Sequence, residues 1–294
     1  RRIPPLLWTR VRSDLPGYLA DREADGVTVI NWYHKTFMVA AKQRYFVKDT
    51  DSVYFHSCLS DYFLGTFGGG ICKPFRYTEI QKHMFKLKSK ESTADRKVPA
   101  QPLCFMDKHG KHARYNLRKL SEMPYHLIRC GRYNDLYCTV LFNYNWLLNK
   151  LIGLPLIQVL EDFEDALYNI KGKSARKEIS LVADSIRLGG SILKVYPEML
   201  AAQLVGRLLP ERAVHDNIQS LLQECDEAGI RDNALIPAFH CLHTPGGPLR
   251  YSMEGHQFAI FAMRLTTDRR YIVSVSNKFL ILFLIFPASM VLSS

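Results

Sequence analysis

The chain has 294 residues, with 47% hydrophobic and 23% charged residues and a formal net charge of +11. This composition excludes a disordered or collagen-like chain, and the length gives room for about two domains. Its seven cysteines are scattered without a C-x-x-C pair, and no secretory leader follows Arg1. We therefore expect reduced thiols and a cytoplasmic location.

The N-terminal segment predicts a compact unit of helices and one short strand. A proline pair opens a helix whose apolar stripe reaches Leu19. A β-branched strand over 27–30 follows, and further helices begin near Lys35 and near Ser52, the second ending at Gly65. This order of elements is typical of a winged-helix-like unit.

The next segment is irregular and strongly basic. Glycines and prolines interrupt it, and we expect one helix from Tyr77 to Lys88. Residues 73–119 hold 13 Lys/Arg against four acids. Such a run is either an electrostatic footprint for nucleic acid or an anionic membrane surface, or a solvated basic loop. Aromatic residues are not regularly interleaved with the charges, which favours the loop.

From Asn116 onward the apolar spacing is consistently helical and predicts a stack of short helical hairpins. We expect Pro124 to start one helix and the Gly189-Gly190 pair to break another. Asp216-x-x-Gln219 is typical of a capping box, with Gly229 as the C-cap of the same helix. Such an arm offers surfaces for packing rather than a catalytic pocket.

The C-terminal region follows the signature of a WD-repeat blade. Gly255-His256 precedes an apolar strand, a turn over 267–270 and a second strand over 271–277. A propeller needs typically four to eight blades, so we expect only an incomplete first blade. The apolar run that follows, 279–287, is shorter than the ~20 residues of a spanning helix, so we expect no stable membrane insertion. We expect residues 280–294 not to be the native continuation of the blade.

No complete catalytic or metal-binding motif is evident in the sequence, although a catalytic triad is recognised by geometry rather than by sequence. Gly172-Lys173-Ser174 is half of a phosphate loop, but Leu167 stands where the first glycine of that motif is required. No two His/Cys pairs have the spacing of structural zinc sites. The densest cluster, residues 240–243, is better explained as a packed linker than as a metal site. We therefore assign no catalytic residue and no metal ligand, and expect no enzymatic activity.

Three stretches together resemble one protein family. Trp32-Tyr33-His34-x-x-Phe37-x-x-Ala40-Ala41 resembles the winged-helix segment downstream of a NACHT-type signalling ATPase. Ser121-Glu-Met-Pro-Tyr-His-Leu127 resembles the helical linker that joins such ATPases to propellers. His243-Thr-Pro-Gly-Gly-Pro-Leu249 is similar to the lead-in to the repeats of NACHT and WD repeat domain-containing proteins, in particular type 2. The likeness extends over roughly residues 3–279.

The resemblance implies a switch whose ATPase core, with its ATP or ADP, lies outside this chain, so no cofactor is expected here. In related ATPases a histidine in the position of His34 touches the nucleotide phosphate, and Lys35 would add charge to that contact. The alternative is that His34 only caps its helix or packs beside Trp32.

The predicted fold class is mainly α, with a winged-helix-like unit, an α-helical hairpin arm and a short C-terminal β segment. The expected divisions are a winged-helix-like domain (1–65), a basic connector (66–114), the helical arm (115–243), the incomplete blade (244–279) and an apolar tail (280–294). The first hypothesis is a regulatory segment that contacts other domains of the same protein and protein partners. The second is a nucleic-acid-binding module that uses the winged helix and the basic segment. Its candidate anion-contacting side chains are Lys35, Lys86, Lys88 and Lys90.

Overall fold

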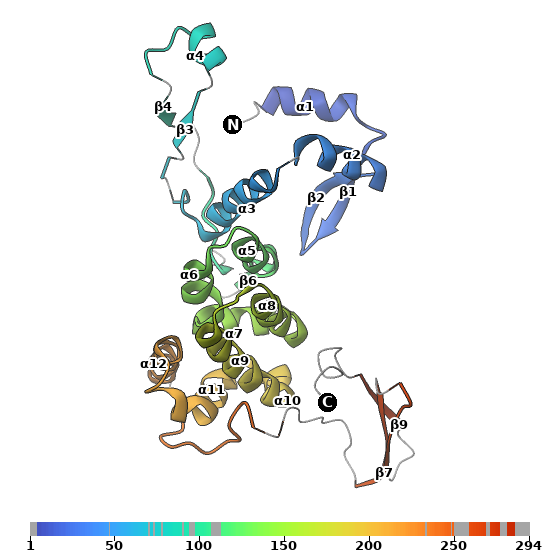
Figure 1. Cartoon of the computed structure of the whole chain (residues 1–294), viewed down its shortest axis with the longest axis vertical. Coiled ribbons are helices and arrows are strands. Elements are labelled where there is room, and N and C mark those ends of the chain that lie inside the picture. The colour runs from blue at the N-terminus through green and yellow to red at the C-terminus, as the bar shows by residue number, and fades with distance from the viewer. Residues whose placement is uncertain are drawn as a thin grey trace.

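A computed structural model describes most of the chain and shows an elongated, mainly helical molecule (Figure 1). The mainly α fold class is confirmed. Four separate antiparallel sheets, three of two strands and one of three, accompany the helices in the part of the chain that is described. The described residues are 5–46, 48–69, 71–72, 74–77, 79–89, 91–93, 98–106, 113–232, 234–247, 249, 259–268, 271–276 and 281–285.

The N-terminal segment contains a β-hairpin that the sequence pattern predicted only in part. Leu19 pairs with Trp32 at its open end, and Asp25-Gly26 forms its two-residue turn. Both turn residues have positive φ, 52° and 73°, as a type I′ hairpin turn requires. Leu19 therefore belongs to a strand, and its assignment to the first helix was wrong. The elements are α1 (Pro5–Asp14), β1 (Leu19–Ala24), β2 (Val27–Trp32), α2 (Lys35–Tyr45) and α3 (Asp49–Leu64).

The third helix ends where the sequence predicts. Gly65 adopts the left-handed conformation at the C-cap of α3, with φ 78°, and its amide donates to the last turn of the helix. A residue with a Cβ would be strained in that conformation. The predicted start of α2 and the predicted end of α3 are thus confirmed, while the winged-helix assignment stays a prediction.

The basic connector is less helical than predicted. Its helix spans only Glu79–Met84, because Lys86 turns into the left-handed region with φ 50° and the Leu87 amide donates back to the Lys82 carbonyl at 3.0 Å. This bond pattern terminates a helix. The elements here are β3 (Pro74–Arg76), α4 (Glu79–Met84), β4 (Glu91–Thr93), β5 (Cys104–Met106) and β6 (Ala113–Tyr115), which pair as β3 with β4 and β5 with β6.

The helical arm is a continuous stack of helices, as predicted. Gly189 separates two helices at the expected break. The elements are α5 (Leu117–Arg129), α6 (Tyr133–Leu136), the π-helical turn η1 (Tyr137–Leu141), α7 (Tyr144–Gly153), α8 (Leu156–Asn169), α9 (Lys173–Leu188), α10 (Gly190–Val195), the 3-10 turns η2 (Pro197–Met199) and η3 (Leu209–Glu211), α11 (Leu200–Leu208) and α12 (Asp216–Arg231).

Three predicted helix boundaries in the arm are wrong. Pro124 lies inside α5, whose actual N-cap is Asn116, with a side chain that accepts a bond from an amide of the first turn. The last helix is capped by the backbone of His215 without a side-chain bond, so Asp216 does not form the predicted capping box. Gly229 is buried within that helix, which continues to Arg231.

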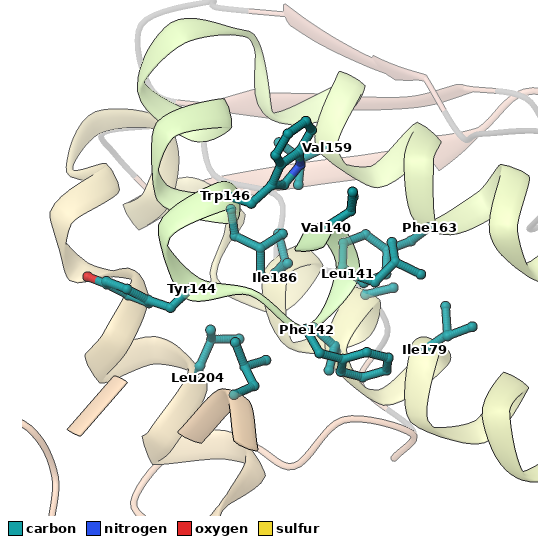
Figure 2. Packing of buried hydrophobic residues seen from close by; sticks show 14 of the residues in the cluster. Val140, Leu141, Phe142, Tyr144, Trp146, Val159, Phe163, Ile179, Ile186 and Leu204 are labelled. Atoms are coloured by element: carbon teal, nitrogen blue, oxygen red, sulfur yellow. The ribbon is translucent and has the colours of Figure 1, made fainter. Parts of the chain in front are cut away.

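One hydrophobic core fills the arm (Figure 2). Trp146 and Phe163 are among its largest fully buried side chains. Among the described residues before Leu117, only Phe63, with 1% exposure, belongs to this core, and it enters from α3. Further members labelled in Figure 2 are Val140, Leu141, Phe142, Tyr144, Val159, Ile179, Ile186 and Leu204.

The C-terminal strands form a small antiparallel sheet that Figure 1 shows beside the arm. The two strands predicted for the blade are confirmed as β7 (Ile260–Leu265) and β8 (Tyr271–Ser276). A further strand, β9 (Ile281–Ile285), pairs with β8 within the segment expected to be a non-native tail. Gly255 and His256, which carry the repeat signature, lie outside the described residues.

Candidate functional site

His34 stands at the first turn of α2, directly after the hairpin. Its backbone is extended, with φ −120° and ψ 141°, and its Nδ1 accepts a hydrogen bond from the Thr36 amide at 3.2 Å. The same nitrogen lies 2.9 Å from the Thr36 hydroxyl oxygen. The ring is exposed, and Nε2 is the atom that an incoming anion would meet. The capping role weighed from the sequence is therefore present, and contact with a phosphate through Nε2 stays a prediction.

Three aromatic rings hold the start of α2 against the hairpin. Phe37 packs edge-on against Tyr18, with ring centroids 5.0 Å apart, and lies 6.2 Å from Trp32. The Tyr33 amide donates to the Tyr18 carbonyl at 2.8 Å, which extends the hairpin pairing towards His34. This packing fixes the direction in which the helix N-terminus points. These contacts account for the aromatic residues Trp32 and Phe37 on either side of His34 in the sequence.

Lys35 is the first residue of α2 and is exposed beside His34. A cation at a helix N-terminus interacts unfavourably with the helix dipole. An anion bound at the same place would offset this unfavourable interaction. The other predicted anion-contacting side chains lie elsewhere: Lys86 and Lys88 follow α4, and Lys90 lies outside the described residues. Figure 1 shows α4 well separated from α2, so the segment that carries Lys86 and Lys88 does not form one site with His34.

Three cations near the end of the basic segment form contacts within the folded chain. The Lys119 ammonium is buried and donates to the Gln101 carbonyl at 2.6 Å, and burial lowers its pKa. Arg118 forms an ion pair with Glu122 at 2.8 Å. The Arg114 guanidinium lies over the Phe105 ring, 5.2 Å from its centre. Of these three cations only Lys119 is buried and so removed from the basic surface predicted from the sequence, whereas Arg114 and Arg118 stay accessible.

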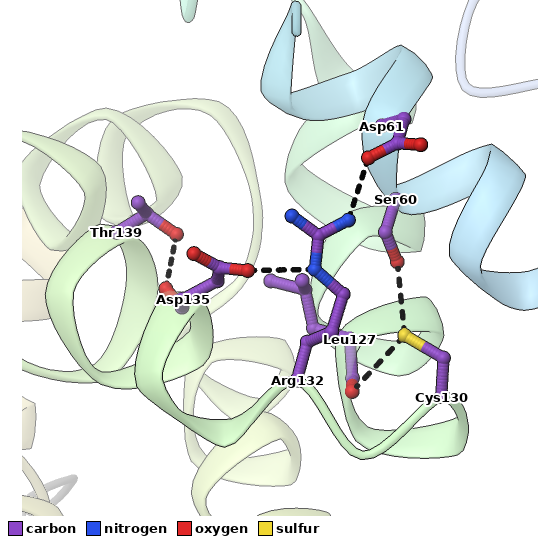
Figure 3. A network of polar contacts seen from close by, with 7 residues as sticks. All are labelled: Ser60, Asp61, Leu127, Cys130, Arg132, Asp135 and Thr139. Carbon is purple, nitrogen blue, oxygen red and sulfur yellow. Dashed lines mark hydrogen bonds and ion pairs between the residues drawn. The ribbon is translucent and has the colours of Figure 1, made fainter.

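A polar seam joins α3 to the arm (Figure 3). The Arg132 guanidinium bonds both to Asp61 of α3 and to Asp135 of α6, each at 2.6 Å. Burial lowers the pKa of Arg132, but the bonds to the two carboxylates outweigh it and raise the pKa. Beside this pair the Ser60 hydroxyl lies 3.5 Å from the Cys130 sulfur. Sequence reasoning missed the seam, because Asp61 and Arg132 are 71 positions apart.

A histidine pair extends the same seam. The Nδ1 atoms of His56 in α3 and His126 in α5 lie 2.8 Å apart, so one ring donates and the other accepts. Burial lowers the pKa of His56, and the nearby charges of His126 and Arg129 lower it further. His126 also lies 3.7 Å from Glu122. The seam therefore keeps His56 neutral and bonded to the arm at neutral pH.

The linker after α12 is packed onto the arm at two glycines. The Cys241 and Leu242 amides both donate to the Gly206 carbonyl, at 3.3 and 3.1 Å. A Cβ at Gly206 would lie 2.9 Å from the Leu242 side chain, and one at Gly229 would lie 2.4 Å from Ile236. Leu242 thus packs on the arm, as the packed-linker interpretation expects, while His240, Cys241 and His243 stay exposed.

The described residues hold no group of three or more side chains arranged to bind a metal ion. Within the same residues, none of the helices has the length and apolar character needed to cross a bilayer. Lys173 begins α9 after another helix rather than after a strand, so the partial phosphate loop has the context that the sequence indicated.

Comparison with known proteins finds similarity between this chain and parts of much longer proteins. It is 30% identical over 271 residues to NACHT and WD repeat domain-containing protein 2 of Homo sapiens, which covers 86% of this chain and 15% of that protein. The chain is related to the NACHT and WD repeat domain-containing proteins. NACHT domain- and WD repeat-containing protein 1 is 32% identical over 287 residues in Homo sapiens and 30% identical over 280 in Mus musculus, each time covering 92% of this chain and 17% of the relative.

The chain thus spans about one sixth of the length of these relatives. No protein-family model matches the chain, and no solved structure matches it. The family resemblance stated from the sequence motifs is confirmed by the relatives, which are similar over nearly all of this chain.

Proposed function

We propose that this chain is the regulatory and protein-interaction segment of a cytoplasmic NACHT-type ATPase with WD repeats. Residues 5–65 form the winged-helix-like unit that contacts the nucleotide-binding core, and the arm carries the resulting movement towards the propeller. The chain itself is not catalytic and carries no cofactor. Its partners are the other domains of the same protein and further proteins.

One observation carries this proposal. None of the side chains described between Trp8 and Phe46 is buried, although this segment forms two helices and a hairpin. Trp8, Tyr33, Met38 and Val39 are all exposed. Elements that bury no core of their own gain little stability in isolation, and a partner surface would supply the missing burial.

The polar seam supports the second half of the proposal. It bonds α3 to α5 and α6 through charged and imidazole groups, while Phe63 anchors α3 in the arm core. A movement of the N-terminal unit therefore passes to α3 and from there to the arm. Domain closure around a bound nucleotide is the common source of such movement in switch ATPases.

His34 is the proposed nucleotide sensor, with Lys35 beside it. In the longer protein, His34→Ala removes one hydrogen bond to a phosphate, and such bonds contribute about 1.5–3 kcal/mol. We expect the rate of ADP release to rise by roughly ten- to a hundredfold. Fluorescent ADP chased with unlabelled nucleotide measures this rate. The matched control is His240→Ala, which changes an exposed histidine of the linker and should leave the rate unaltered.

The chain alone provides a separate test. Purified as it stands, it should neither bind ATP in calorimetry nor hydrolyse it. ATP turnover that survives purification and disappears in Lys173→Ala would refute the non-catalytic role. An unchanged rate of ADP release in His34→Ala would instead reject only the sensing role of this histidine.

A further inference from the structure

One part of the basic connector projects from the rest of the molecule, and we call it the finger. It consists of β3, β4 and the loop between them. β3 and β4 pair antiparallel, with Pro74 opposite Thr93, and α4 lies in the loop between them. In Figure 1 this finger extends from the end of α3 away from the arm, with α4 at its far end. We call residues 79–89 the α4 tip. Its position leaves it accessible to a large partner.

Apolar side chains gather at the α4 tip. Ile80 is 75% exposed, Met84 65% and Phe85 55%. Ile80 and Met84 are four positions apart on α4, so they share one face of the helix. Single exposed apolar residues are ordinary, but three of them on a short projecting element indicate a surface that is covered in use.

Positive charge surrounds these side chains. Lys86 and Lys88 are exposed directly after α4, and Lys82 is half-buried on it. Residues 73–93 hold six Lys/Arg and two acids, Glu79 and Glu91, which gives a net charge of +4. The partner that complements this tip is therefore anionic and also offers an apolar phase.

We propose that the α4 tip binds the surface of an anionic phospholipid membrane. Ile80, Met84 and Phe85 enter the boundary between headgroups and acyl chains, while the lysine ammonium groups stay at the phosphates. A convex, projecting tip can enter a bilayer interface without a preformed groove. Nucleic acid fits less well, because Ile80 and Met84 offer no ring for base stacking and Phe85 already packs edge-on against Tyr77, with centroids 6.3 Å apart.

The expected binding is reversible and salt-dependent. Each lysine near an anionic surface strengthens binding about fivefold, and the apolar side chains add to this attraction. Screening shortens the reach of the lysine charges as salt rises, so binding should weaken between about 0.1 and 0.5 M salt. This peripheral contact differs from insertion of a spanning helix.

The experiment is co-sedimentation of the whole chain with vesicles of phosphatidylcholine alone or mixed with phosphatidylserine. We expect binding only to the mixed vesicles. Lys86→Gln with Lys88→Gln should weaken it about 25-fold, and Ile80→Ser with Met84→Ser at least about tenfold. Free inorganic phosphate at equal ionic strength should not compete, since the apolar contribution requires a lipid phase.

Matched control variants lie on the arm. Lys171→Gln with Lys173→Gln removes two exposed lysines, and Ile230→Ser makes one of the same apolar changes at a side chain that is 81% exposed. Neither should alter vesicle binding. Circular dichroism of every variant checks that the helical content is unchanged.

Several results would overturn the proposal. One is no binding to the mixed vesicles; another is binding that both tip variants retain, which would assign it to the apolar C-terminal residues. Binding of a single-stranded RNA oligonucleotide that depends on Lys86 and Lys88, without vesicle binding, would favour nucleic acid instead. Self-association that Ile80→Ser with Met84→Ser abolishes, again without vesicle binding, would assign the tip to a second copy of this chain.

Discussion

The helical arm and the N-terminal unit both contain regular secondary structure, but their internal packing is opposite. The arm encloses one core that includes Trp146, Phe163 and Leu204, whereas no described side chain between Trp8 and Phe46 is buried. The ion pairs of the two regions differ in the same way in how far they are exposed. Lys150 and Asp162 meet at 2.5 Å inside the arm, and Arg12 and Asp21 meet at 2.7 Å in the open. Secondary structure alone therefore does not tell which part of this chain is stable by itself.

The largest expected effect is the loss of a core ring from the arm. Phe163→Ala leaves a cavity at a fully buried position, so the free energy of unfolding should fall by about 3–5 kcal/mol. Trp32→Ala, in the hairpin, should change the same arm transition by less than about 0.5 kcal/mol. Urea unfolding followed by far-ultraviolet circular dichroism measures both. Equal losses in the two variants would mean that the regions unfold as one unit.

The buried ion pair predicts that the free energy of unfolding depends on pH. Burial raises the pKa of Asp162 from its ordinary 3.8 to about 7, and the Lys150 ammonium keeps it from rising further. Between about pH 4 and pH 7 the folded chain therefore holds more protons on Asp162 than the unfolded chain does. The contribution of this group to the free energy of unfolding should fall as pH rises through that range, by at most about 1.4 kcal/mol per pH unit.

Asp162→Asn tests this dependence directly. Chemical unfolding at pH 4.5, 5.5 and 6.5 should show a flatter profile in the variant than in the parent chain. Asp21→Asn, at the exposed pair, is the matched control and should leave the profile unchanged. Parallel profiles for Asp162→Asn and the parent would show that Asp162 ionises normally in the folded chain.

A small effect on stability is expected where the arm meets its linker. Gly229→Ala gains helix propensity of about 1 kcal/mol but places a Cβ against Ile236, so the free energy of unfolding should shift by less than about 1 kcal/mol. The displaced linker should nevertheless be cut faster by chymotrypsin near the exposed Phe239. Gly172→Ala, where the added atom meets only Ala175, should not change the cleavage rate. Identical cleavage in both variants would show that Ile236 does not hold the linker.

Local signals in the sequence predicted most helices and strands. Features that depend on contacts between distant positions could not be predicted in this way. Apolar spacing and Gly65 were sufficient for α2 and α3, and Asp25-Gly26 was a hairpin signal that the helical stripe through Leu19 concealed. Pro124 led to a wrong helix start because proline is common in the first turn of a helix, whereas the actual N-cap is Asn116. Gly229 was predicted as a helix end, but its lack of a side chain instead leaves room for Ile236 to pack against the helix.

The candidate sites divide in the same way. The exposure of His34 and Lys35 at a helix start could be expected from local pattern, since a strand and a helix meet there. The burial of Lys119 could not, because it depends on the Gln101 carbonyl 18 positions earlier. The seam around Arg132 depends on a partner still farther away in the sequence.

The anchoring of α3 by Phe63 has a mechanical consequence. The helix has 16 residues, so at 1.5 Å per residue it is a rod of about 24 Å. Its C-terminal half, from His56 to Phe63, contacts the arm, and its N-terminal half extends beyond these contacts. A tilt of about 10° about His56 would displace the N-terminal end of α3, about 10 Å away, by roughly 2 Å. Small rearrangements at these contacts would therefore shift the point at which the chain enters α3.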